Sequence, residues 1–262
     1  MKISLFFLSL LVSISAFGQT DSLETRAYEL LQKAKMQQLS KDELKEVRAY
    51  GTNIQNHGFI LEEKNQDYEG SLIEIDKSLN IWYQLNDTFR TANLLKYKGY
   101  LLGHLNQFAE AKIEIDSAIY LFGAVKYPSG VAVSQLDLSK VYEQEQNLDS
   151  ALKYVDITIA FWKMQKDTFR IVTSGNQAIN LFLKMKRYGP ASDMQRELTL
   201  MLSAKNIYWQ PVLEFYFLSI QLFRKTNQQE QARQYQLLYK DKIRSLTDQN
   251  IIPIIRYGPC PD

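Results

Sequence analysis

Residues that could catalyse a reaction or hold a metal are sparse in this sequence of 262 residues. Its two histidines, His57 and His104, are far apart, and neither belongs to a histidine–carboxylate zinc motif, so we expect no metal site. Ser150 and Lys153 have the spacing of a serine–lysine catalytic pair, but the Ser-Asp-Asn and Lys-Thr-Gly motifs that accompany it do not occur. Gly-rich phosphate loops and the Gly-x-Ser-x-Gly motif are also missing. We therefore expect a non-enzymatic protein without a cofactor; an enzyme of unrecognised type would need a reactive cluster formed only on folding.

The composition favours a helical protein with a surface of mixed charge. Hydrophobic residues make up 45% of the chain, and its 11 glycines and 6 prolines are few for an all-β protein with many turns. Lys and Arg total 31 against 29 Asp and Glu, a net charge of +2. Nucleic-acid-binding domains have a larger basic excess, so we expect no nucleic-acid partner.

Residues 1–18 have the pattern of a secretory signal peptide. Lys2 is followed by an apolar run from Ile3 to Ile14, and the small residues Ala16 and Gly18 precede an expected cleavage site. The run is shorter than the ~20 apolar residues that a membrane span needs. We therefore expect an exported protein, periplasmic or secreted, without a stable membrane span after cleavage. An uncleaved anchor helix is the alternative.

The single cysteine, Cys260, lies in residues 248–262, which we expect to form a flexible tail. One cysteine cannot close an internal disulfide, so we expect a free thiol in an exported protein. A mixed disulfide or a disulfide-linked dimer is the alternative.

The strongest regularity in the sequence is a repeat of forty residues. Its rows open at Tyr68, Phe108, Leu148 and Tyr188, and small residues follow three positions later, at Ser71, Ala111, Ala151 and Ala191. Fourteen residues after the openings stand Trp82, Phe122, Trp162 and Leu202. This spacing of apolar residues predicts one amphipathic helix in each row.

A second helix is predicted in the other half of each row. One of its columns holds Leu102, Tyr142, Phe182 and Leu222, and the column three residues earlier holds Gly99, Ser139, Ile179 and Ser219. Because small residues let helices approach closely, we expect each row to form a helical hairpin. Asp87 and Asp167 are predicted helix caps. Trp82, Phe122, Phe161 and Trp162 are predicted core residues, whereas Trp209 lies at a link between helices and carries no such prediction.

These residues resemble the tetratricopeptide repeat family. The match is clearest in Leu138–Tyr142 and Asn147–Tyr154, which have the family's order of apolar, small and aromatic residues followed by an alanine. The period exceeds the family's usual ~34 residues, as in the extended repeats of bacterial sensor and peptide-response proteins. The resemblance implies an all-α, right-handed superhelix of antiparallel hairpins without separable domains. It implies a repeat domain over residues 19–247, with capping helices at 21–64 and repeats that start near residues 68, 108, 148, 188 and 228.

The resemblance also implies a scaffold that binds a peptide or protein partner in a concave groove lined by the first helix of each pair. The candidate groove residues are the polar residues off the predicted buried stripe: Asn93, Lys96, Tyr100, Lys140, Gln144, Asn176, Asn180, Lys184, Tyr216 and Arg224. Asparagine can bind backbone amides, and Lys and Arg can pair with carboxylates. The alternative for these residues is an ordinary solvated surface.

The sequence therefore supports two hypotheses about the function. The first is an exported, non-enzymatic scaffold that binds a peptide or protein in its groove. The alternative is the sensory portion of a bacterial signal-transduction protein that lacks its membrane and output domains.

Overall fold

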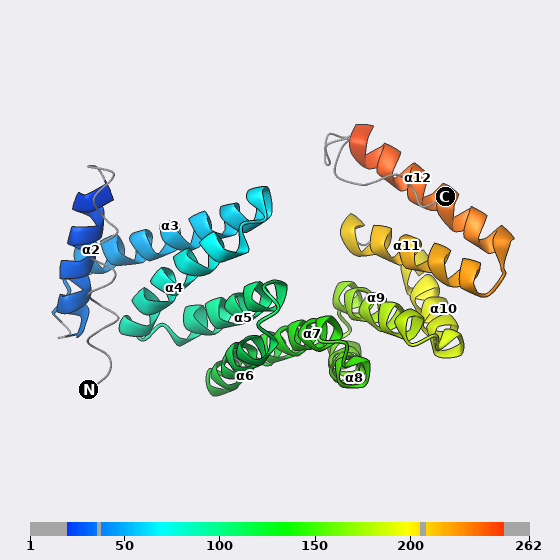
Figure 1. Cartoon of the computed structure of the whole chain (residues 1–262), viewed down its shortest axis with the longest axis horizontal. Coiled ribbons are helices and arrows are strands. Elements are labelled where there is room, and N and C mark those ends of the chain that lie inside the picture. Colours follow the sequence, from blue (N-terminus) through cyan, green and yellow to red (C-terminus); the bar gives the residue numbers. More distant parts are fainter. Residues whose placement is uncertain (1–19, 36–37, 205–207, 249–262) are drawn as a thin grey trace. The chain divides into compact units, whose positions relative to one another are not determined.

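The computed structural model describes residues 20–35, 38–204 and 208–248, and these residues form eleven α-helices and no strand (Figure 1). The all-α prediction is confirmed. The helices are α2 (Thr20–Lys35), α3 (Lys41–Asn65), α4 (Tyr68–Gln84), α5 (Thr88–His104), α6 (Phe108–Ala124), α7 (Pro128–Gln144), α8 (Leu148–Gln165), α9 (Thr168–Lys184), α10 (Tyr188–Ala204), α11 (Trp209–Lys225) and α12 (Gln229–Asp248).

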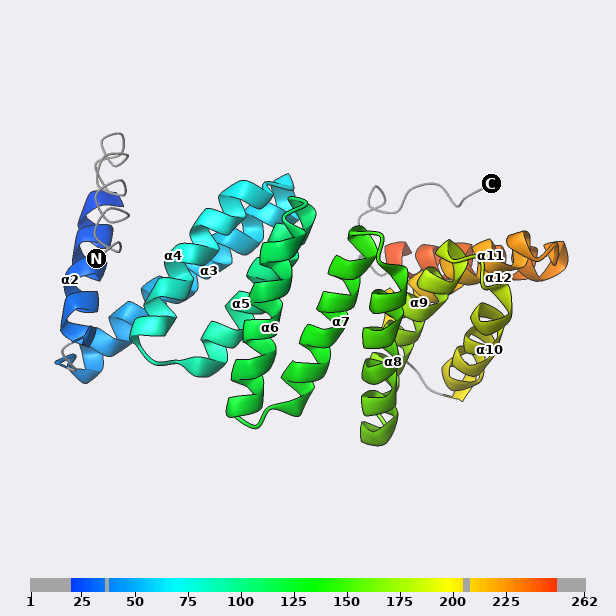
Figure 2. The same cartoon turned by 60° about the horizontal axis from the view of Figure 1, so that its bottom comes forward.

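Consecutive helices pack as hairpins. The pairs are α3 with α4, α5 with α6, α7 with α8, α9 with α10 and α11 with α12, and α4 also packs on α5 and α8 on α9. Figures 1 and 2 show α3 beside α4 and α11 beside α12 from two directions. We call α3, α5, α7, α9 and α11 the first helices of the hairpins and their partners the second helices. Four second helices begin at the residues that open the forty-residue rows: Tyr68, Phe108, Leu148 and Tyr188.

The turns between helices repeat every twenty residues. A residue with positive φ lies just after the end of eight helices. These residues are Gln66, Asn86, Asn106, Lys126, Gln146, Lys166, Lys186 and Asn227. This left-handed conformation reverses the chain after each helix. The next residue caps the following helix in four turns, where the side chains of Asp67, Asp87, Asn147 and Asp167 accept a backbone N–H three residues on, at 2.8–3.2 Å. The predicted caps at Asp87 and Asp167 are confirmed.

The columns read from the sequence are buried between the helices. Ser71, Ala111, Ala151 and Ala191 are fully buried, as are Trp82 and Phe122, and Trp162 is nearly so. The core positions of these three large aromatic residues are confirmed. Phe161 is only half-buried and lies edge-on to Trp162, with ring centroids 4.7 Å apart. Trp209 is also half-buried, at the start of α11.

Gly99 in α5 marks a close approach of two helices. A Cβ atom at this position would lie 2.4 Å from Ile115 Cγ1 and 2.9 Å from the carbonyl oxygen of Ala111, both on α6. The packing reason expected for this glycine is therefore confirmed.

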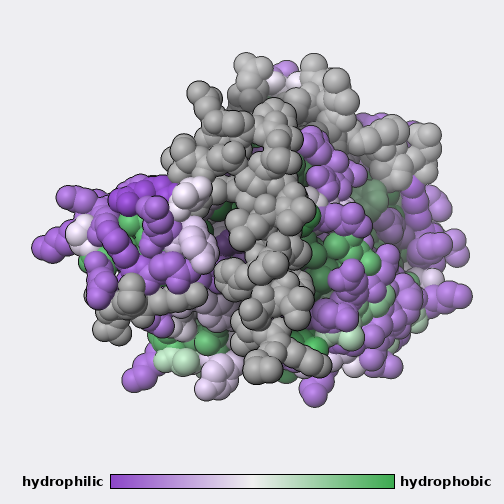
Figure 3. Space-filling model, turned by 60° about the vertical axis from the view of Figure 1, so that its left-hand side comes forward, coloured by the Kyte–Doolittle hydropathy of each residue, from purple (hydrophilic) through white to green (hydrophobic). Residues whose placement is uncertain are grey.

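The chain divides into two compact units, Met1–Tyr127 and Pro128–Asp262. The described part of the first unit contains α2 to α6, and that of the second contains α7 to α12. In a repeat protein each hairpin contacts only its neighbours, so no single core has to run through the whole chain. The visible face in Figure 3 is mostly hydrophilic, with smaller hydrophobic patches, as the mixed composition predicts.

The helices α2 and α3 occupy most of the segment predicted to form the N-terminal cap. α3 packs along α4 as the first helix of a hairpin. Leu30 and Leu31 of α2 share a buried cluster with Val47 and Ile81. No helix in the described ranges is long and apolar enough to cross a membrane. The predicted signal peptide (residues 1–18), Cys260 and most of the predicted tail (248–262) lie outside the described residues.

Candidate functional site

The first helices of the second unit carry a connected set of polar side chains. Glu143 of α7 is nearly buried, with an exposed fraction of 9%, and it accepts hydrogen bonds from two side chains of α9. Gln177 Nε2 donates to Glu143 Oε2 at 2.6 Å, and Asn180 Nδ2 donates to Oε1 at 2.7 Å. Lys184 Nζ forms an ion pair with the same Oε1 at 2.6 Å. One carboxylate therefore holds three side chains of the neighbouring first helix.

Asn176 extends this set from α9 to α11. Its Nδ2 donates to the carbonyl oxygen of Pro211 at 2.8 Å and lies 3.2 Å from Glu214 Oε2. The side chain is fully buried, and its Oδ1 has no hydrogen-bond partner. The expectation that Asn176 lies off the buried face is therefore wrong, because the close packing of α9 on α11 covers this position. We call the set formed by Lys140, Glu143, Asn176, Gln177, Asn180, Lys184 and Glu214 the α7–α9–α11 network.

Glu214 is the acidic side chain of this network that solvent reaches. Desolvation by the surrounding protein nevertheless raises the pKa of its carboxyl, and nearby Glu143 raises it further, while the hydrogen bond from Asn176 and the charge of Lys140 lower it.

The other candidate residues of the second unit have varied surroundings. Lys140 is exposed and pairs with Asp137 one turn earlier, at 3.2 Å. Gln144 is exposed at the end of α7, and Arg224 is half-buried near the end of α11. Tyr216 is half-buried, edge-on to Tyr235 with ring centroids 5.9 Å apart, and burial raises the pKa of its hydroxyl. Of the candidate residues, Asn180 and Lys184 thus share Glu143, and Asn176 binds α11. Lys140 reaches this set only through its charge, which acts on Glu214.

The candidate residues of the first unit lie on α5. Asn93 Nδ2 donates to the carbonyl oxygen of Phe89 at 3.0 Å, within its own helix. Lys96 is half-buried. The hydroxyl of Tyr100 donates to Glu62 Oε1 of α3 at 2.9 Å, so this tyrosine links two first helices.

Sequence reasoning missed the carboxylates that organise these surfaces, Glu62, Glu143 and Glu214. Each stands one helix away from the polar residues it binds, so spacing within a single helix does not reveal it. The sequence signal is an acidic residue about 35 positions from an amide or tyrosine in the next or the preceding first helix.

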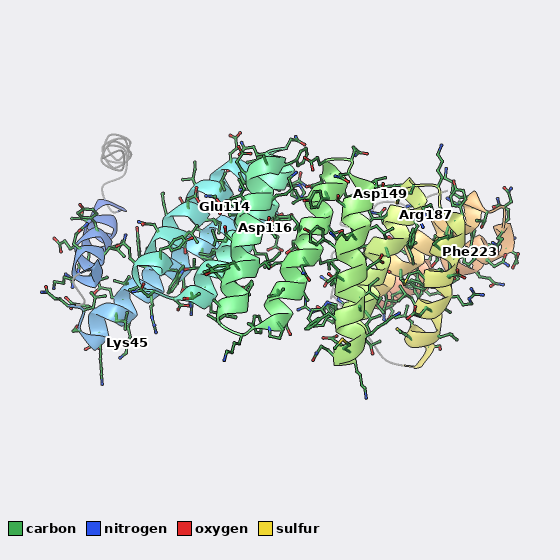
Figure 4. All side chains as sticks on the ribbon, turned by 90° about the horizontal axis from the view of Figure 1, so that it is seen from below. Lys45, Glu114, Asp116, Asp149, Arg187 and Phe223 are labelled. Atoms are coloured by element: carbon green, nitrogen blue, oxygen red, sulfur yellow. The ribbon has the colours of Figure 1, made fainter. Side chains whose placement is uncertain are left out.

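Several other carboxylates in the described ranges have cationic partners. Lys98 of α5 lies between Asp76 of α4 and Glu114 of α6, at 2.8 and 3.0 Å. Figure 4 labels Glu114 on α6. Lys33 pairs with Glu43 at 2.5 Å. The same ranges contain no group of three His, Cys, Asp or Glu side chains that could hold a metal ion.

No family model and no curated protein matches this chain. Solved structures do. The chain is similar to BtubC (BKLC) from P. vanneervenii, with a TM-score of 0.66 at 12% identity, covering 94% of this chain and 96% of that one. It is similar to a Rap protein complexed with Competence and Sporulation Factor, with a TM-score of 0.64 at 10% identity, covering 92% and 70%. A third match is the STAND protein PH0952 from Pyrococcus horikoshii, which has a tetratricopeptide repeat sensor, with a TM-score of 0.61 at 13% identity, covering 90% and 38%.

The fold is a tetratricopeptide-like helical repeat. This confirms the resemblance read from the small and aromatic columns of the sequence. The five packed hairpins, from α3–α4 to α11–α12, are the TPR-like repeats of this chain. The α7–α9–α11 network lies on the first helices of three successive repeats. Because identity to these structures is low, the match concerns the arrangement of helices alone.

Proposed function

We propose that this chain is a non-enzymatic scaffold that binds a peptide or protein segment along the first helices of its TPR-like repeats. The observation that carries the proposal is the α7–α9–α11 network, in which Glu143, Asn176 and Glu214 connect three successive first helices. At these positions apolar side chains would pack the helices together without the free-energy cost of desolvating polar groups.

The cost of the network supports a role in binding. A nearly buried carboxylate loses hydration, and its ion pair with Lys184 repays that loss only in part. Asn176 also leaves its Oδ1 without a partner in the core. Helix packing alone requires neither arrangement. Accessible donors and acceptors beside them, on Lys140 and Glu214, suit the alternating N–H and C=O groups of an extended peptide.

The similar structures support the same class of function. One of them is a Rap protein in complex with Competence and Sporulation Factor, and another contains a tetratricopeptide repeat sensor. One of these proteins is thus complexed with another molecule, and the other has a sensor built from repeats of this kind. We extend that role to this chain.

A binding experiment with two matched double variants tests the proposal. A random peptide library is selected against the purified protein, and the enriched peptides are measured against Lys140→Ala/Glu214→Ala and against Asp193→Ala/Arg196→Ala. Each double variant removes one positive and one negative charge from exposed positions, the second pair on the second helix α10. Asn176 is avoided because its side chain is fully buried and its loss would alter the packing.

We expect the first double variant to lose at least about tenfold in affinity and the second to bind like the wild type. Circular dichroism spectra of both variants should match that of the wild type. A library that yields no binder, or binders that are insensitive to the first variant, would count against the proposal.

We further propose that the chain is exported and cleaved after Gly18. The charged start, short apolar run and small residues of its first eighteen positions support this. Mass spectrometry of the protein recovered from fractionated cells would show a chain beginning at Gln19 outside the cytoplasm. A full-length chain in the cytoplasmic fraction would contradict it.

A second candidate function is the sensory portion of a signal-transduction system. The likeness to the tetratricopeptide repeat sensor of PH0952, where the chain covers 38% of a longer protein, supports it. A stable complex with a separate membrane or output protein, recovered by crosslinking in cells, is the expected result. Recovery of the protein without such a partner would favour the stand-alone scaffold.

A further inference from the structure

One half-buried carboxylate of the first unit is surrounded by aromatic rings. Glu62, in the last turn of α3, accepts hydrogen bonds from two tyrosines of α5. Tyr100 Oη donates to Oε1 at 2.9 Å, and Tyr97 Oη donates to Oε2 at 3.4 Å. Burial raises the pKa of Tyr97 to about 12, so its hydroxyl remains a donor at neutral pH.

The rings around this carboxylate form a continuous platform. Phe59 packs edge-on against Tyr97, Tyr97 stacks on Tyr100, and Tyr100 lies edge-on to His104, with ring centroids 4.6, 5.7 and 4.6 Å apart. His104 in turn stacks on Tyr68 at 4.6 Å. We call Phe59, Glu62, Tyr68, Tyr97, Tyr100 and His104 the Glu62 cluster. None of these side chains is fully buried, and His104 is exposed, so the platform is open to solvent.

The negative charge of Glu62 is not compensated within the described residues. Its partners there are the two neutral tyrosine hydroxyls, and no Lys, Arg or His of that part of the chain forms an ion pair with it. Glu143, by contrast, is paired with Lys184, and Glu114 with Lys98. Glu62 also stands at the C-terminal end of a helix, where the helix dipole disfavours an anion.

We infer that the Glu62 cluster is a subsite for a cationic side chain, arginine or lysine, of a peptide that binds to the first helices α3 and α5 of the first unit. The inference rests on the proposed function, since it names the partner chemistry at one place on the first helices of that unit. A guanidinium or ammonium group would neutralise Glu62 and lie against the electron-rich faces of Tyr97 and Tyr100.

Other occupants fit this site less well. An acidic side chain would be repelled by Glu62. An apolar side chain would cover the carboxylate and remove its remaining water without replacing the lost hydrogen bonds. A carboxylate has about four acceptor sites, and two are used by the tyrosine hydroxyls, which leaves acceptor capacity for a forked guanidinium.

Blocked peptides that differ in a single charge test the subsite. The probes are Ac-Ala-Ala-Arg-Ala-Ala-amide and the same peptide with citrulline, which has nearly the shape of arginine but no charge. Their binding to the wild-type protein is measured by NMR titration at neutral pH. We expect the arginine peptide to bind about tenfold more tightly than the citrulline peptide, from the combined charge and ring contacts.

Three variants separate the causes of that preference. In Glu62→Gln the preference for arginine should disappear, because the charge is gone while the shape is kept. In Tyr100→Leu it should fall, because one ring is gone. Glu63→Gln, which changes a neighbouring exposed carboxylate, should leave it intact. The thermal unfolding of each variant is compared with the wild type to show that it folds.

The outcomes distinguish this inference from the proposed function. Equal binding of the two peptides, a preference that survives Glu62→Gln, or no binding of the arginine peptide at millimolar concentration would each overturn the subsite. In those cases the peptide-library experiment on Lys140 and Glu214 still decides whether the chain binds peptides at all. A preference that Glu62→Gln abolishes and Glu63→Gln preserves supports the subsite.

Discussion

Replacing Gly99 by alanine should destabilise the protein, although the same change in an open helix stabilises it. Alanine is favoured over glycine in a helix interior by about 1 kcal/mol. At Gly99 the new Cβ would lie 2.4 Å from Ile115 Cγ1 and 2.9 Å from the backbone oxygen of Ala111. A side chain can rotate, but a backbone oxygen cannot move unless α6 shifts away from α5.

Overpacking of this kind costs about 1 to 3 kcal/mol, and the helix propensity of alanine returns about 1 kcal/mol, so the net loss in the free energy of unfolding should be up to about 2 kcal/mol. For a chain of this size each 1 kcal/mol corresponds to about 2 to 4 °C in the melting temperature. The matched control is Gly123→Ala, in the last turn of α6, where nothing lies within 4 Å of the place that a Cβ atom would take. There the substitution should stabilise the protein by up to about 1 kcal/mol.

Urea unfolding followed by far-ultraviolet circular dichroism measures both variants. The two midpoints should move in opposite directions, Gly99→Ala to lower urea and Gly123→Ala to the same or higher urea. If Gly99→Ala were as stable as Gly123→Ala, the close approach of α5 and α6 would not be what requires glycine, and the reasoning would be refuted.

Three further predictions use the same unfolding measurements. Lys166→Gly, at a left-handed turn position with φ of 56°, should stabilise the protein by about 0.5 kcal/mol, whereas Lys153→Gly within α8 should cost about 1 kcal/mol; equal effects would contradict this. The hydrogen bond from Lys33 and the Ser40 cap lower the pKa of Glu43 from 4.5 to about 2. The stability that ionised Glu43 gives the folded protein is therefore complete above the pKa of the unfolded state and is lost as the pH falls towards 2. The stability gap between wild type and Glu43→Gln should therefore close over that range, and a constant gap would argue against it. Glu143→Ala should cost about 3 kcal/mol because three donors lose their acceptor, and a neutral effect would show that the network is dispensable.

Much of the architecture was predictable because it depends on the local periodicity of the sequence. The spacing of Tyr68, Ser71 and Trp82 repeats every forty residues, and contacts between residues three or four apart are properties of any helix. Asp87 and Asp167 cap helices through bonds to residues three positions away. Gly99 signalled a close helix contact because nothing else favours glycine inside a helix.

The candidate site was predictable only in part. The sequence indicates which helices carry polar residues on their outward faces, and Lys140 is indeed exposed there. It does not indicate that Asn176 would be covered by α11, nor that Asn180 and Lys184 would be held by Glu143. The division into two units was equally hidden, because the repeat continues through the boundary after Tyr127 without a change of register.

The sequence by itself determined the helical hairpin, its forty-residue period, its turns and its buried columns, because these depend on neighbours within one or two helical turns. Only the tertiary structure decided which polar side chains meet. The bonds from Asn176 to Pro211, Gln177 to Glu143 and Tyr100 to Glu62 join residues 34 to 38 positions apart on different helices. Whether such groups meet depends on the distance and rotation between packed helices, and the backbone pattern of one helix does not contain that information.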